Sequence, residues 1–191
     1  MKIILKILLL FLFTAEIFAR EAGETEITTD DGIEVYQNEK YYLLKKNVKI
    51  LSDSFELTAN NVKVSFNKNL YDIILIEAKE NVVFKSFELG IQGKGNSVNY
   101  YVDLQKLKLE GINSKLITQD IKMLSDGYIV VNNSNGSFKI EGINSKFIND
   151  SVVIESNSIE GVLSEDKNQK EITYLYVIDE NISNIKNNNI D

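Results

Sequence analysis

The sequence predicts an all-β chain built from stacked antiparallel hairpins. From Glu26 onward apolar and polar residues alternate with a period of two, which places successive side chains on opposite faces of a sheet. Short polar breaks separate the alternating runs at intervals of about 8 to 12 residues, the strand spacing of a sandwich, roll or solenoid. Several segments also recur along the chain. The prediction therefore starts from one β domain rather than from alternating helices and strands.

The first predicted strands alternate most clearly. Val48 and Ile50 alternate with Asn47 and Lys49, and the same pattern continues through residues 55–59 and 62–66. The later predicted strands are 82–84, 87–91, 98–102, 107–109, 128–131, 138–140, 152–154, 159–163 and 172–178. The polar breaks predicted as turns are 52–53, 60–61, 67–69, 93–96 and 132–136. The last of these ends in Asn135-Gly136, a dipeptide suited to the positive φ angles of a tight hairpin.

Internal repeats favour stacking. Residues 110–115 read Glu-Gly-Ile-Asn-Ser-Lys, and residues 141–146 repeat this segment without change. Earlier, Asn47-Val48 followed by residues 54–57 recurs as Asn81-Val82 followed by residues 86–89. Repeats of this size are typical of units that cannot bury their own apolar face and share an interior with their neighbours.

The composition excludes most catalysis. The 191 residues contain no His, Cys or Pro, so a Ser-His-Asp triad, a Cys nucleophile, a His or Cys zinc site and an iron–sulfur cluster are ruled out. Asp30-Asp31 is the most visible carboxylate pair, but it precedes Gly32 and is typical of a turn. We expect no enzyme activity, no metal site and no cofactor.

Charge argues against nucleic acid as a partner. The formal net charge is −7, and Arg20 is the single arginine, so the bidentate arginine contacts that recognise phosphates and bases are missing. The lysines are interspersed with acidic residues, which is typical of a solvated surface.

Residues 1–19 have the pattern of a secretory signal peptide. Lys2 and Lys6 precede an apolar run at 7–13, and Ala19 is a small residue at the expected cleavage point. The alternative is a retained membrane anchor, although Glu16 interrupts the run before the roughly 20 apolar residues of a spanning helix. We expect a β domain over residues 20–180 and an Asn-rich tail over 181–191.

Six segments between residues 26 and 111 carry a family resemblance: 26–35, 47–50, 55–64, 76–82, 93–100 and 107–111. In order and spacing they resemble the OstA-like (LptA) family of periplasmic lipopolysaccharide-transport proteins. Lys46 and Glu80 stand where this family commonly has glycine before Asn-Val. Because glycine would ease a tight turn, we expect the turn geometry to differ there.

The resemblance implies a twisted β jelly roll, open along one side, whose groove holds the acyl chains of lipopolysaccharide. It also implies edge-to-edge stacking of copies into a bridge between an inner-membrane complex and an outer-membrane receptor. The candidate groove residues are the inward members of the alternating runs: Ile27, Val48, Ile50, Phe55, Leu57, Val62, Val64, Val82, Phe84, Leu89, Val98, Tyr100, Leu107 and Leu109. A closed sandwich needs the same alternation, so a plain core role for each remains open.

Two other functions remain open at this point. One is a membrane-anchored, LptC-like component of the same transport system, with residues 3–19 retained. The other is a β-solenoid surface protein that binds no lipid.

Overall fold

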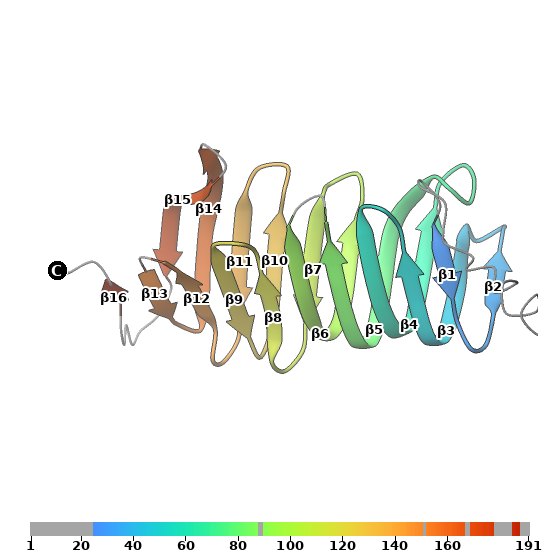
Figure 1. Ribbon diagram of the computed structural model, residues 1–191, viewed down its shortest axis with the longest axis horizontal. Coiled ribbons are helices and arrows are strands. Elements are labelled where there is room, and N and C mark those ends of the chain that lie inside the picture. Colours follow the sequence, from blue (N-terminus) through green and yellow to red (C-terminus); the bar gives the residue numbers. More distant parts are fainter. Residues whose placement is uncertain (1–24, 88–89, 151, 167–168, 178–184, 188–191) are drawn as a thin grey trace, which may run out of the picture.

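The computed structural model describes residues 25–87, 90–150, 152–166, 169–177 and 185–187. They form one continuous sheet in which every pairing is antiparallel, so the predicted all-β class is confirmed. Its strands stand across the long axis of an elongated molecule (Figure 1). In chain order they are β1 (Glu26–Thr28), β2 (Ile33–Tyr36), β3 (Tyr41–Leu51), β4 (Phe55–Phe66), β5 (Ile73–Ser86), β6 (Ile91–Tyr101), β7 (Lys106–Glu110), β8 (Ser114–Ile117), β9 (Ile121–Ser125), β10 (Tyr128–Asn132), β11 (Ser137–Glu141), β12 (Lys146–Asn149), β13 (Val152–Glu155), β14 (Ser158–Asp166), β15 (Gln169–Val177) and β16 (Ile185–Asn187). No helix within the described ranges is long and apolar enough to cross a membrane.

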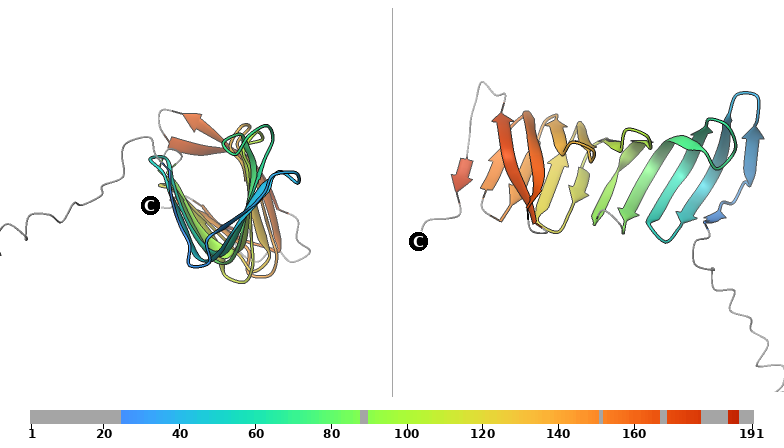
Figure 2. Two further views of the ribbon diagram at one scale, coloured as in Figure 1. Left: turned by 90° about the vertical axis from the view of Figure 1, so that its right-hand side faces the viewer. Right: turned by 90° about the horizontal axis from the view of Figure 1, so that it is seen from above.

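Strands β3 to β6 bend halfway along their length, so that one half of each strand belongs to one wall and the other half to a second wall. The register shifts at each bend, between Lys45 and Val48 in β3, between Thr58 and Asn61 in β4, and between Lys79 and Val82 in β5. Bulges of this kind increase the local bend and twist of a strand. The end view in Figure 2 shows the two walls meeting along one side, which we call the base, and separating on the other.

Beyond β6 each wall continues with short strands of its own. Residues 97–101 of β6 pair with β7, whereas residues 92–94 pair with β8. The first wall then runs β7-β10-β11-β14-β15, and the second runs β8-β9-β12-β13-β16. The chain after Ile112 is therefore an extension of the same roll, a point that the sequence left open. The predicted signal peptide lies outside the described residues, and part of the predicted tail forms β16, which pairs with β13.

The repeated Glu-Gly-Ile-Asn-Ser-Lys segments form equivalent turns at the base. Gly111 and Gly142 have φ angles of 124° and 130°, and both Asn113 and Asn144 have φ of 58°. In each turn the serine hydroxyl donates to the glycine carbonyl, at 2.6 Å for Ser114 and 2.7 Å for the later copy. The matching geometry confirms that this repetition is structural.

Asp126 ties these two turns together. One of its carboxylate oxygens accepts a hydrogen bond from the Asn113 backbone at 2.8 Å, and the other accepts one from the Asn144 side chain at 2.7 Å. The Asn144 bond and then the Asn113 bond hold the pKa of Asp126 below its usual value, because both favour the charged form. A carboxylate between consecutive turns thus fixes the spacing of the units along the base.

The two positions where glycine was missing keep a glycine-like backbone. Lys46 and Asn47 have φ of 68° and 51°, and Glu80 and Asn81 have φ of 63° and 56°. Both positions lie at bends inside strands rather than in tight turns, and the expected difference from the family's turn geometry stays a prediction. A non-glycine residue in this left-handed region costs about 1–2 kcal/mol.

Replacing Glu80 with glycine should therefore stabilise the protein. Relief of the left-handed strain exceeds the entropy cost of a glycine, about 0.5–1 kcal/mol, so we expect a net gain of up to about 1 kcal/mol in the free energy of unfolding. Denaturant titration followed by circular dichroism measures it. The control is Glu77→Gly in the same strand, paired with Lys63 at 3.6 Å, which should destabilise. Equal losses in both variants would contradict the strain assignment.

Several of the predicted boundaries are wrong. The polar breaks at 60–61 and 93–96 lie inside β4 and β6, and residue 87 belongs to the turn between β5 and β6 rather than to a strand. The predicted strands also include no counterpart of β1, β2, β8, β9, β12 or β16. The turn at Asn135-Gly136 is confirmed, with Gly136 at φ of 72°.

Candidate binding groove

The predicted inward residues lie on the inner faces of the two walls. Nine are buried in a single apolar cluster that joins both walls: Val48, Ile50, Leu57, Val62, Val64, Val82, Phe84, Val98 and Leu109. Ile27, Phe55, Tyr100 and Leu107 are partly buried, and Leu89 lies outside the described residues. Alternation along the strands therefore identified the inner surface.

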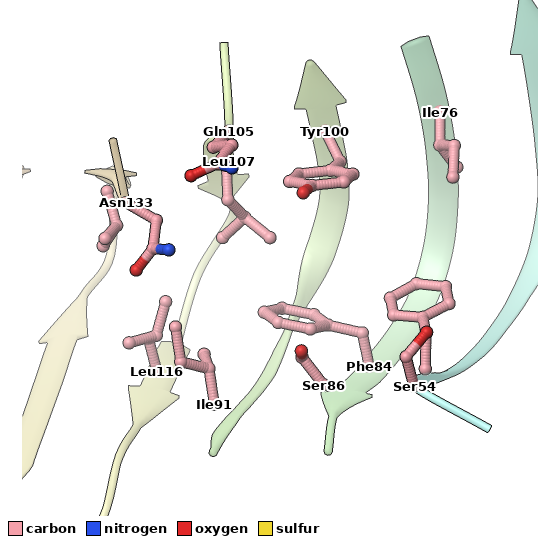
Figure 3. Close-up of a pocket in the computed structure, with 12 residues that line it drawn as sticks. Ser54, Ile76, Phe84, Ser86, Ile91, Tyr100, Gln105, Leu107, Leu116 and Asn133 are labelled. Carbon is pink, nitrogen blue, oxygen red and sulfur yellow. The ribbon is translucent and has the colours of Figure 1, made fainter. Parts of the chain in front are cut away.

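A cavity of about 290 Å³ opens between the walls near the middle of the molecule. Figure 3 shows Ile76, Tyr100 and Leu107 of the first wall facing Phe84 and Leu116 of the second. Four predicted residues line it: Phe55, Phe84, Tyr100 and Leu107. The other described members of the predicted set do not line this cavity and form core beside it.

Eight lining residues were not predicted. The apolar ones are Ile76, Ile91, Leu116 and Val131, and the polar ones are Ser54, Ser86, Gln105 and Asn133. Ile76 and Ile91 continue the alternation of β5 and β6, so the periodicity could have found them. The polar residues lie at strand ends or in turns, where no periodic signal distinguishes inside from outside.

A glycine opposite Phe84 lets its ring lie flat across the neighbouring strand. Phe84 and Gly93 are directly paired between β5 and β6, and a Cβ atom on Gly93 would come within 2.3 Å of the Phe84 ring. Gly161 leaves the same space beside Phe138, between β14 and β11. These glycines are packing positions, which explains why the glycine cluster at 93–96 does not form a turn.

Two stacked phenylalanines limit the groove on its C-terminal side. Phe138 of the first wall and Phe147 of the second lie with ring centroids 5.1 Å apart and planes 16° apart, and both rings are buried. The walls therefore touch through side chains at β11 and β12, whereas they leave a cavity between β5 and β8.

Charged side chains of the described strands form ion pairs on the outer faces of the walls. Ion pairs cross neighbouring strands there, including Lys63 with Glu77 at 3.6 Å and Lys139 with Glu160 at 2.8 Å. Exposed pairs of this kind contribute at most about 1 kcal/mol each. Of the described residues that line the cavity, none is charged. Burial raises the pKa of Tyr42, whose ring packs against the inner cluster.

No metal site was found in the described part of the chain, which holds no group of three or more acidic residues placed to bind an ion.

Comparison with known proteins identifies the family. No curated protein matches the chain. Among solved structures, LptH from Pseudomonas aeruginosa, described as the LptA-homologous periplasmic component of the lipopolysaccharide transport device, is 16% identical, with a TM-score of 0.49, over 58% of this chain and 76% of that one. The family model for the LptA/LptD N-terminal-domain lipopolysaccharide transport protein matches residues 26–137, more than half of the chain. This match reaches past the resemblance at 26–111 and confirms that the chain is not an enzyme. The chain therefore belongs to the LptA/LptD N-terminal-domain family of lipopolysaccharide transport proteins.

Proposed function

We propose that this protein is an LptA-like periplasmic carrier that holds the acyl chains of lipopolysaccharide between its two walls. The observation that carries the proposal is the apolar cavity between walls that are fused at the base and separate on the other side (Figure 2). Each methylene group removed from water contributes about 0.8 kcal/mol. A cavity of 290 Å³ has room for about ten groups of the size of a water molecule, so the acyl chains alone would supply several kcal/mol of binding.

Transport by such a carrier involves no covalent step. Lipid is held by burial alone, and the energy for directed movement comes from a partner ATPase of the inner-membrane complex. On this proposal the protein hands lipid toward an outer-membrane receptor after removal of residues 1–19. A mature N-terminus near Arg20, determined by sequencing, would exclude the anchored LptC-like alternative.

The ends of the sheet support edge-to-edge stacking. Among the described strands, the edges of the first wall are β2 and β15, and those of the second are β1 and β16. Because neighbouring strands alternate in direction from β2 to β15, those two edges run in opposite directions. β15 of one copy would thus pair antiparallel with β2 of the next, a head-to-tail contact that repeats without closing.

Photo-crosslinking tests the lipid site. A photoreactive residue at Phe84 or Leu107 should crosslink to lipopolysaccharide in cells, because both line the cavity. The same residue at Val83, adjacent to Phe84 but 52% exposed, is the matched control and should give no adduct. Crosslinking from position 83 alone, or from no position in a folded protein, would reject the groove.

Substitution at the N-terminal edge tests stacking. Val35 of β2 is 52% exposed, so Val35→Asp should spare the fold while placing a charge at the proposed contact. We expect the sedimentation coefficient of the wild-type mature chain to increase with protein concentration in sedimentation velocity. The variant should need at least tenfold higher concentration for the same increase. The control is Val83→Asp, on an outer face away from both edges. An unchanged profile for Val35→Asp would exclude β2 from the contact.

A further inference from the structure

The rim of the cavity carries uncharged polar groups on both walls. Gln105, Asn133 and Tyr100 lie on the first wall, and Ser54 and Ser86 lie on the second (Figure 3). Amide and hydroxyl side chains both donate and accept hydrogen bonds. Below this rim the lining is apolar, with Phe84, Leu107 and Leu116 at its centre.

The lysines on strands beside the cavity are not part of its lining. In β7 the inner residues Leu107 and Leu109 alternate with Lys106 and Lys108, so both lysines face outward. Lys85, next to Phe84, lies over the exposed ring of Phe87 at 5.0 Å. Of the described residues that line the cavity, none supplies the cationic donor that normally holds a phosphate.

The turns beside the cavity add negative charge. Asp53 directly precedes Ser54, and Asp103 lies in the turn before Gln105; both aspartates are exposed, on opposite walls. The lining of the cavity itself offers hydrogen-bonding side chains to an uncharged group and no cation to a phosphate.

We propose that this site, resting on the lipid-carrier function above, recognises the uncharged hydroxyl-, ester- or amide-bearing base of acyl chains, and that phosphates add nothing to affinity. The acyl tails fill the apolar floor, and the polar atoms at their carboxyl ends meet Gln105, Asn133 and the serine hydroxyls. Specificity then resides in acylation and not in head-group charge.

A matched lipid pair tests the proposal. Diphosphorylated lipid A and the same lipid with both phosphates removed, in identical neutral micelles, should bind the mature protein with affinities within threefold. Affinity for both should change less than twofold between low and physiological salt. Binding of the phosphorylated form more than tenfold tighter would overturn the inference and leave the carrier function standing, whereas failure of both lipids to bind would reject the carrier function itself.

A rim variant tests the polar contacts. Gln105→Leu should weaken binding of the dephosphorylated lipid by about tenfold, which corresponds to about 1.4 kcal/mol and to the loss of one hydrogen bond. Its affinity for a plain alkyl chain of equal length should not fall. The control is Gln92→Leu, on the exposed outer face of β6, which should bind both ligands like the wild type. An unchanged affinity of Gln105→Leu for the acylated lipid would contradict the assigned contact.

Discussion

Replacing Phe147 with alanine is expected to lower the free energy of unfolding by about 3–5 kcal/mol. The ring has no exposed surface and stacks on Phe138 across the interior, so its removal leaves a cavity where the two walls meet. Such a loss is a large part of the total stability of a domain, which is usually about 5–15 kcal/mol. Denaturant titration of the mature chain, with circular dichroism as the signal, measures the change.

Phe87 provides the matched control for this loss. It lies outside the core and is 45% exposed, so Phe87→Ala should change stability by no more than about 0.5 kcal/mol. A double-mutant cycle with Phe138→Ala should give a coupling of about 0.5–1.5 kcal/mol. A cost below about 1 kcal/mol for Phe147→Ala would mean that the walls do not pack at this level and that the groove continues through it.

The apolar alternation shifts by one position at the strand bends, two of which the polar residues predicted as turns. In β4 the inner residues change from Leu57 and Ala59 to Val62 and Val64, a shift of one position across Asn60-Asn61. A hairpin would reverse the chain there, whereas a bulge keeps its direction and shifts the phase by one. The change of phase therefore distinguishes a bend from a turn, whereas a pair of polar residues alone does not.

The binding site was harder to predict, because it depends on which strands face each other. Ser54 and Asn133 are far apart in the sequence but line the same cavity. They come together because β6 pairs with β7 on one wall and with β8 on the other. Alternation assigns a residue to the inner face, but it does not reveal whether the opposite wall fills that space. Phe138 and Phe147 fill it, whereas Tyr100 and Leu116 leave it open.

Replacing Gly142 with alanine is the second substitution for which we expect a large loss, about 2–6 kcal/mol. Its φ of 130° is outside the range that a residue with a side chain adopts at low cost. A Cβ atom would also lie 2.5 Å from the backbone nitrogen and 2.7 Å from the Cα of Gly127. Because these are backbone atoms of the adjoining turn, neither can move aside without separating two units of the roll.

A substitution at Gly90 distinguishes the two causes of this loss, backbone strain and close contact with the adjoining turn. Gly90 also has a positive φ, 60°, but a Cβ atom added there would meet no other atom within 4 Å. Gly90→Ala should therefore cost only the left-handed strain, about 1–2 kcal/mol, and the excess for Gly142→Ala measures the close contact between turns. Gly111, at the same place in the earlier repeat with φ of 124°, should behave like Gly142. If all three variants lost the same stability, close packing of the turns would not explain why glycine occupies both copies of the repeat.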